Sequence, residues 1–249
     1  MPAGLKALRS RLRRANCLAP RRKKAPALPR LPPGARNRAK LTYERLREAY
    51  PAVTELAHRD PFQLLIATIL SAQTTDRSVN SITPELFRRY PTAADLAAAD
   101  PAVVEELIKP TGFFRNKTRS IIAASRKLVE LFGGVVPNNL DDLVKLPGIG
   151  RKTANVILGV GFEVPGFAVD THVKRLTNRL KLTSSKDPVK IERQVCSIVP
   201  KEEWTGLSLR LILHGRRICI ARRPRCERCI LNDFCPSSTT RPKGRKEPA

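Results

Sequence analysis

The sequence predicts an all-α fold with short connections. Three Asp-Pro pairs, at residues 60–61, 100–101 and 187–188, place an N-cap residue before a proline at the first helical position. Apolar residues at helical spacing follow each pair. No stretch shows the sustained alternation of a strand, and the nearest candidate is the short segment "GVVP" at 134–137. Helices are therefore expected along the chain.

The expected helices follow in order. The longest apolar run, "LLIATIL", lies in the first of them and is far shorter than the roughly 18 residues of a bilayer span, so it is a buried helix segment. The segment 117–132 ends at Gly133 and Gly134, which form a C-terminal stop. The predicted helices cover residues 62–70, 102–108, 117–132, 141–146, 170–182, 189–199 and 202–217.

Charge is the strongest bulk signal. The chain of 249 residues has 47 Lys and Arg against 22 Asp and Glu, a net charge of +25. Residues 1–40 hold 13 of these cations and no acid, so residues 41–249 keep 34 cations against 22 acids, a net +12. A polyanionic partner is expected, and nucleic acid is the usual one. The alternative is a solvated basic surface.

Both ends of the chain are basic tails. Residues 1–37 are rich in Pro and Arg, nearly free of aromatic residues, and expected to be disordered. Their composition also suits a mitochondrial presequence, but the prolines argue against an amphipathic targeting helix. Residues 237–249 form a second basic tail, and no secretory signal is visible.

Residues 141–158 are expected to form a helix, a tight hairpin and a second helix. Pro147, Gly148 and Gly150 suit a turn with positive φ and close backbone approach. The amides of both glycines, with the N-terminus of the following helix, can then seat a phosphate group. The alternative is an ordinary helical hairpin.

The first turn of the second helix carries Arg151 and Lys152, where the helix dipole disfavours cations. This placement favours a neutral amine on Lys152, the form that can act as a nucleophile. The alternative is a surface lysine that contacts phosphate.

Six cysteines are present, and four of them lie within 17 residues in the pattern C-x6-C-x2-C-x5-C. Four thiolates this close can bind zinc or an iron–sulfur cluster, and the absence of a secretion signal disfavours disulfides. Their irregular spacing slightly disfavours zinc. His214 is a conceivable alternative ligand, whereas Cys17 and Cys196 are expected to be incidental.

These motifs together resemble the endonuclease III family of DNA base-excision glycosylases. The resemblance rests on "LPGIGRKTANVILGVGF" (146–162), "EVPGFA" (163–168), "VDTHVKRL" (169–176), "LSAQTTD" (70–76), "TGFFRNK" (111–117) and the cysteine cluster. It covers about residues 41 to 236, with the motifs in the family's order.

The resemblance implies two helical lobes that flank a DNA-binding cleft. One lobe, residues 54–164, is a six-helix barrel with the helix-hairpin-helix. The other is a helical iron–sulfur lobe that joins residues 38–53 to residues 165–236. It further implies that Lys152 is the nucleophile and Asp170 the catalytic carboxylate of a bifunctional enzyme. From position alone, Asp170 is the N-cap of its helix, and both roles are compatible.

Further residues take roles from the same resemblance. A flipped nucleotide leaves a gap in the duplex, and Gln73 and Phe113 match the family's fillers. Without the family, either Phe113 or Phe114 is a core residue. Asp76 is expected to support local structure, and His172 to be packed or hydrogen-bonded.

By the same resemblance, the cofactor is a [4Fe–4S] cluster. Its implied ligands are Cys219, Cys226, Cys229 and Cys235. Within the cluster's first loop, Arg222, Arg223 and Arg225 are expected to contact DNA phosphates, as is Arg151 beside the hairpin; the alternative is a solvated charge run.

The resulting hypothesis is a DNA glycosylase that removes oxidised pyrimidines from duplex DNA and cleaves abasic sites by β-elimination through a lysine Schiff base. We expect a monomer that binds no membrane and lies in the bacterial cytoplasm with the nucleoid. One alternative is an adenine-specific mismatch glycosylase, which usually lacks this lysine and carries a further C-terminal domain; about fourteen residues follow Cys235 here. The other is a non-catalytic DNA-binding module.

Overall fold

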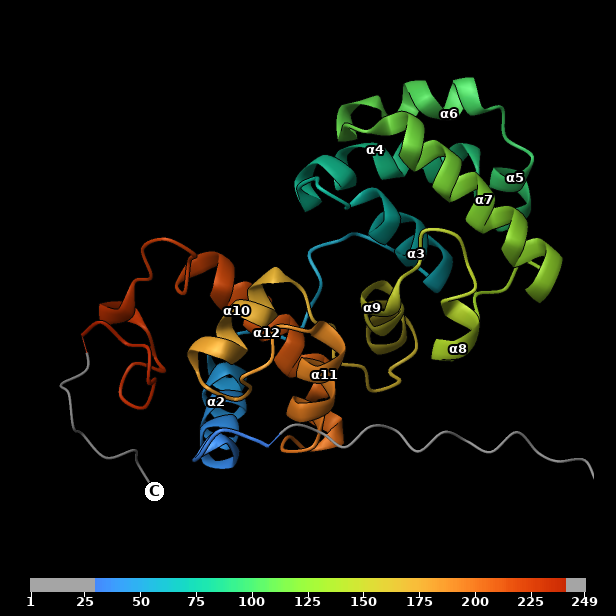
Figure 1. Cartoon of the computed structure of the whole chain (residues 1–249). Coiled ribbons are helices and arrows are strands. Elements are labelled where there is room, and N and C mark those ends of the chain that lie inside the picture. Colours follow the sequence, from blue (N-terminus) through green and yellow to red (C-terminus); the bar gives the residue numbers. More distant parts are fainter. Residues whose placement is uncertain (1–29, 241–249) are drawn as a thin grey trace, which may run out of the picture.

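A computed structural model describes residues 30–240 of the chain, and every regular element in this range is helical (Figure 1). The predicted all-α class is thereby confirmed. Residues 1–29 of the predicted N-terminal tail, residues 241–249 of the C-terminal tail, and Cys17 lie outside the described residues. The prediction of disorder up to residue 37 is wrong at its end, because residues 35–37 are helical. No helix of the described part is long and apolar enough to cross a membrane.

Seven consecutive helices build the first lobe, with a core drawn from residues between 56 and 158. They are α3 (Pro61–Leu70), α4 (Asp76–Arg89), α5 (Ala93–Ala97), α6 (Pro101–Ile108), α7 (Phe114–Phe132), α8 (Leu140–Leu143) and α9 (Arg151–Gly161). A 3₁₀ turn, η1 (Lys109–Thr111), follows α6. Because α3, α7 and α9 carry the most deeply buried apolar faces, they form the centre of this lobe.

The second lobe has a separate core, to which both ends of the described chain contribute. It contains α2 (Ala35–Ala49), α10 (Thr171–Arg179), α11 (Pro188–Cys196) and α12 (Trp204–Arg217), with the 3₁₀ turns η2 (Lys201–Glu203) and η3 (Cys226–Arg228). Helix α2 packs against α12, so the blue N-terminal helix lies among the yellow and orange helices in Figure 1. The chain therefore leaves the second lobe after α2 and returns to it after α9.

The three predicted Asp-Pro starts are confirmed at α3, α6 and α11. In each case the aspartate side chain accepts a hydrogen bond from a first-turn amide, at 2.8 Å for Asp60, 2.9 Å for Asp100 and 2.8 Å for Asp187. Each cap satisfies one of the amides that a helix start leaves unpaired, while the proline has no amide to satisfy.

Other helix boundaries differ from the prediction. Helix α7 begins three residues earlier than expected, directly after Phe113 with its left-handed backbone. Helix α10 ends at Arg179, three residues early, because Lys181 takes a positive φ of 50° that ends the helical path. Helices α2, α4 and α5 were not predicted. Helix α4 was missed because Pro84 lies inside it and polar residues dominate its sequence.

The two lobes touch where α9 crosses α12, and a glycine permits the contact. A Cβ atom at Gly159 would lie 2.5 Å from Thr205 Cγ2, closer than any real packing distance. The Thr205 hydroxyl also exchanges hydrogen bonds with the backbone of Gly166, accepting from its amide at 3.1 Å and donating to its carbonyl at 3.2 Å. Thr205 therefore holds both α9 and the link between the lobes.

We expect Gly159→Val to lower the midpoint of thermal unfolding by about 5 °C, because overpacking costs about 1–3 kcal/mol and exceeds the gain in helix propensity. Thr205→Ala removes two of the three clashing side-chain atoms. The double variant should therefore be more stable than the sum of the single changes predicts. Simple additivity would show that the close approach is not what limits this position.

Candidate active site and metal centre

The helix-hairpin-helix is held by apolar side chains on both sides of its turn. Leu146 and Ile149 are buried in the first core, and the amide of Ile149 donates to the carbonyl of Leu146 at 3.1 Å. Gly148 has a φ of 79°, and a Cβ there would touch Ser120 at 3.4 Å. The expected positive φ and close approach are thus found at Gly148.

Gly150 differs from the prediction, since its φ is −89° with extended backbone. It is the N-cap of α9, and a Cβ at this position would meet nothing within 4 Å. Having no side chain, it supplies no cap to the first-turn amides of α9. These amides therefore suit an anion from outside the protein, in front of an open surface.

Lys152 and Asp170, from different lobes, line the same solvent-open cavity. Val156 of α9 and the α12 residues Leu209, Ile212 and Leu213 give it an apolar side. The cavity therefore brings an amine and a carboxylate from the two lobes together beside an apolar wall.

Asp170 is the N-cap of α10, as expected. Its Oδ1 accepts a hydrogen bond from the amide of Val173 at 2.7 Å. The cap occupies one carboxylate oxygen and restrains the side chain, so the other oxygen can act elsewhere.

An ion cluster at the same cavity joins the two lobes. Arg216 of α12 donates through Nη1 to Asp76 Oδ2 at 2.8 Å and to the carboxylate of Glu55. Asp76 was expected to support structure locally, but its partner belongs to the other lobe. Neither Arg216 nor Glu55 was singled out from the sequence, because an arginine in the run "HGRR" gives no sign of a carboxylate 140 residues away.

Arg151 has a partner that the sequence did not reveal. Its guanidinium makes two parallel hydrogen bonds of 2.7 Å to the carboxylate of Glu192 on α11. The hydrogen bond to Glu192 raises the pKa of Arg151 above its usual value. Arg151 therefore ties the start of α9 to the second lobe, rather than standing free for a phosphate contact.

Gln73 and Phe113 line one hollow beside the hairpin, together with Gly148. Thr68 borders both this hollow and the cavity of Lys152, so the two are adjacent. Phe113 is 65% exposed, whereas Phe114 packs against the first core. The expectation that one of these two phenylalanines is a core residue is confirmed, and it is Phe114.

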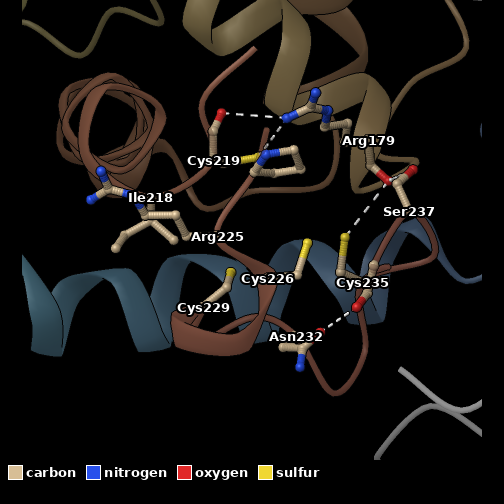
Figure 2. A pocket seen from close by; sticks show the side chains of 11 residues that line it. Arg179, Ile218, Cys219, Arg225, Cys226, Cys229, Asn232, Cys235 and Ser237 are labelled. Carbon is tan, nitrogen blue, oxygen red and sulfur yellow. Dashed lines mark hydrogen bonds between the residues drawn. The ribbon is translucent and has the colours of Figure 1, made fainter. Parts of the chain in front are cut away.

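The four clustered cysteines line a single cavity (Figure 2), and none of them is in a disulfide. Arg179 of α10 donates through Nη1 to Cys219 Sγ at 3.2 Å and to the carbonyl of Ile220 at 2.9 Å. Its Nη2 donates to the carbonyl of Ala221 at 2.6 Å. One arginine therefore fixes the start of the cysteine segment.

The chemistry of this cavity fits a cationic metal group. Burial raises the pKa of Cys229 to about 12 and also raises that of Cys235. Such thiols stay protonated unless a positive charge is bound between them, and an iron–sulfur core supplies that charge. The donor set of four thiols is also the one that such clusters use.

His214 is a neighbour of the cysteines. It is buried, burial lowers its pKa to about 4, and it is therefore neutral. Its Nε2 lies 3.3 Å from Cys229 Sγ and its Nδ1 lies 3.1 Å from the hydroxyl of Tyr50. His214 thus acts as a hydrogen-bonding partner of one cysteine while all four cysteines remain available.

The arginines of the cysteine loop differ in their surroundings. Arg222 and Arg223 are exposed. Arg225 is also exposed, lines the cysteine cavity, and donates through Nη1 to the carbonyl of Arg217 at 3.4 Å. Cys196 packs against the second core, and burial raises its pKa to about 12, which fits the expected incidental role. His172 is hydrogen-bonded to Arg175, as expected.

Comparisons with known proteins agree with this arrangement. A family model of HhH-GPD superfamily base excision DNA repair proteins matches residues 66–201, and one of the iron–sulfur binding domain of endonuclease III matches residues 219–235. Endonuclease III of Synechocystis sp. is 51% identical over 195 residues, covering 78% of this chain and 89% of that protein. Endonuclease III of Bacillus subtilis is 43% identical over 202 residues, covering 80% and 92%.

A solved structure of endonuclease III is also similar to this chain. A trapped endonuclease III–DNA covalent intermediate superposes with a TM-score of 0.77 at 41% sequence identity. The match covers 81% of this chain and 96% of that one.

The pair of Arg151 and Glu192 should couple the lobes energetically. We expect Arg151→Met and Glu192→Gln each to destabilise the protein, with a coupling of about 1 kcal/mol in the double-mutant cycle, because Arg151 is partly solvent-screened. The coupling, measured by chemical denaturation, should shrink as salt is added. Fully additive effects would show that the pair makes no contribution.

Proposed function

Because this chain belongs to the endonuclease III family, it is a bifunctional DNA glycosylase and AP lyase of base-excision repair that acts on oxidised pyrimidines, and we propose that Lys152 and Asp170 carry the chemistry. The observation that supports the pair is their position: two lobes with separate cores each contribute one of them to a single cavity. An amine and a carboxylate that share one cavity are the two groups that this reaction requires.

In the proposed mechanism, the damaged nucleotide is flipped into the cavity. The neutral Nζ of Lys152 attacks C1′ of the sugar, the bond from C1′ to the base breaks, and the base leaves with the bonding electrons. The carboxylate of Asp170 stabilises the positive character that develops on the sugar and accepts a proton from the nitrogen.

Opening of the sugar ring then gives a Schiff base between Lys152 and C1′. Loss of a proton from C2′ expels the 3′ phosphate, which breaks the strand on the 3′ side of the lesion. Hydrolysis of the Schiff base releases the enzyme. An abasic site enters the same sequence at the aldehyde and loses water instead of a base.

The hairpin is proposed to hold the DNA backbone. The first-turn amides of α9, the open surface in front of Gly150 and the positive φ of Gly148 suit a phosphate group. Gln73 and Phe113 are proposed to fill the gap left by the flipped nucleotide, since both line one exposed hollow next to the cavity.

The chain contains a [4Fe–4S] cluster, and its ligands are proposed to be the four cysteines of the cavity in Figure 2, Cys219, Cys226, Cys229 and Cys235. The cluster ties the loop of residues 220–225 into a fixed shape. Three arginines of that loop are proposed to contact DNA phosphates: Arg222, Arg223 and Arg225. Arg151 is proposed to contact a phosphate only when its ion pair with Glu192 is broken.

The remaining parts of the proposal concern organisation. We place the lobe boundaries at residues 54–164 for the helical barrel and at 38–53 with 165–236 for the cluster lobe, each with its own core. The protein is proposed to act as a monomer on double-stranded DNA in the bacterial cytoplasm, associated with the nucleoid.

Borohydride trapping on DNA that contains an abasic site tests the nucleophile. Wild type should give a covalent complex, Lys152→Ala should give none, and the exposed Lys190→Ala should match wild type. Trapping that persists in Lys152→Ala would overturn the assignment. No trapping with wild type would favour a DNA-binding module without lyase activity.

Asp170→Asn separates capping from catalysis. An asparagine can still accept the hydrogen bond from the amide of Val173, so stability should fall by less than about 1 kcal/mol. Loss of the charge should reduce base release by about 100-fold or more, within the range of acid–base and electrostatic contributions. Equal activity of the two proteins would assign Asp170 to capping alone.

The cluster assignment has a matched control within the chain. Cys235→Ala should lose iron and the yellow-brown colour and unfold at lower temperature, because a ligand is missing. Cys196→Ala should keep its iron, since Cys196 packs in the second core away from the cysteine cavity. Stoichiometric zinc in colourless wild-type protein would contradict the cluster.

A further inference from the structure

A buried lysine lies between the two loops that carry Gln73 and Phe113. Lys117, in the first turn of α7, is only 5% exposed. Its ammonium donates to Thr74 Oγ1 at 2.5 Å and to the backbone carbonyl of Thr111 at 2.8 Å. The hydroxyl of Thr74 also donates to the carbonyl of Thr111, so the three groups form a closed triangle.

Each loop joins this triangle next to its exposed tip. Thr74 directly follows Gln73 in the loop after α3, and Thr111 precedes Gly112 and Phe113 in the loop before α7. Lys117 and the two tip residues line the same hollow. The ammonium therefore lies at the base of both loops, below the side chains that are proposed to enter DNA.

Burial of the Lys117 ammonium costs free energy, so its presence requires an explanation beyond packing. Burial lowers the pKa of Lys117 below its usual value, and within residues 30–240 it has no carboxylate partner. A buried charge without an ion pair is stable only when its hydrogen bonds are satisfied. An apolar residue would fill this position at lower cost if packing were the only requirement.

The backbone of both tips is also unusual. Gln73 has a φ of 55° and Phe113 a φ of 49°, values that non-glycine residues rarely adopt. Each costs about 1–3 kcal/mol unless the surrounding structure enforces it. The ammonium triangle is adjacent to both strained positions and supplies the restraint.

We propose that Lys117 is a positioning residue that locks the two DNA-inserting loops together, so that Gln73 and Phe113 enter the duplex as one preformed unit. The inference rests on the proposed roles of these two tips. Lys117 does not line the cavity of Lys152. Its effect is therefore confined to steps in which the duplex stack is opened.

Lys117→Met tests this inference, because methionine keeps most of the side-chain length and removes the donors. On duplex DNA containing thymine glycol, we expect base release to fall by about tenfold or more, the effect of losing one charge-assisted buried hydrogen bond. Borohydride trapping on a single-stranded abasic oligonucleotide should stay within about twofold of wild type, since no stack must be opened.

Two further variants make the result specific. Lys127→Met changes a half-exposed lysine farther along α7, which pairs only with Glu130 of the same helix in the described residues, and should behave like wild type on both substrates. Thr74→Val removes the second corner of the triangle and should repeat the Lys117→Met pattern, which keeps the inference testable if Lys117→Met does not fold. Combining Lys117→Met with Gln73→Ala should add little to either change alone.

The outcomes separate the inference from the proposed function. Equal losses on duplex and single-stranded substrates would assign Lys117 a merely structural role, and wild-type behaviour on both would also overturn the inference. If Gln73→Ala and Phe113→Ala leave base release unchanged while Lys152 remains essential, the proposed roles of the tips fail, not the chemistry. A fluorescent base opposite the lesion should report weaker unstacking by Lys117→Met and Thr74→Val than by wild type and Lys127→Met.

Discussion

The close approach of α9 to α12 is the constraint on which the active site depends. The two lobes have separate cores, so neither core by itself fixes Lys152 relative to Asp170. Gly159 lets the helices touch, and Thr205 holds the link that leads to Asp170. The amine is nearly two helical turns from this contact, at the N-terminal end of the same rigid helix.

Two ionic contacts between the lobes supplement this packing contact. Arg151 holds the start of α9 to α11, and Arg216 holds α12 to the start of α4. Packing is short-ranged and sensitive to shape, whereas ion pairs tolerate small displacements and weaken in salt.

Local signals in the sequence predicted local structure well. Asp-Pro pairs located three helix starts, and the cysteine spacing located a shared cavity, because each depends on neighbours within a few residues or on one ligand group. Sequence patterns did not predict contacts between residues that are distant in the chain. Glu192 lies 41 residues from Arg151, and no pattern around either residue indicates the other. The φ of Gly150 was also predicted wrongly, because glycine tolerates many values of φ and its presence does not indicate which value is adopted.

The roles of individual basic residues were also difficult to predict from the sequence. In a chain with a net charge of +25, a basic residue is first interpreted as a contact for nucleic acid. Yet several cations link separate parts of the protein: Lys117 joins two loops, Arg179 joins α10 to the cysteine segment, and the exposed Arg216 joins two lobes. A flexible surface cation gains affinity for any polyanion, whereas a satisfied internal cation determines where the exposed groups stand.

The cysteine segment shows why a cluster is needed at this position. Beyond α12 the described chain has only one 3₁₀ turn, so no longer helix and no sheet holds this segment in shape. It contributes Leu231 and Phe234 to the second core, which is little apolar surface to offset the entropy of ordering the segment. Four metal–thiolate bonds from the proposed ligands would close the segment on itself and offset that cost. The arginines of residues 220–225 would then project from a loop whose shape is set by the cluster and by Arg179, which suits their proposed contacts with DNA phosphates.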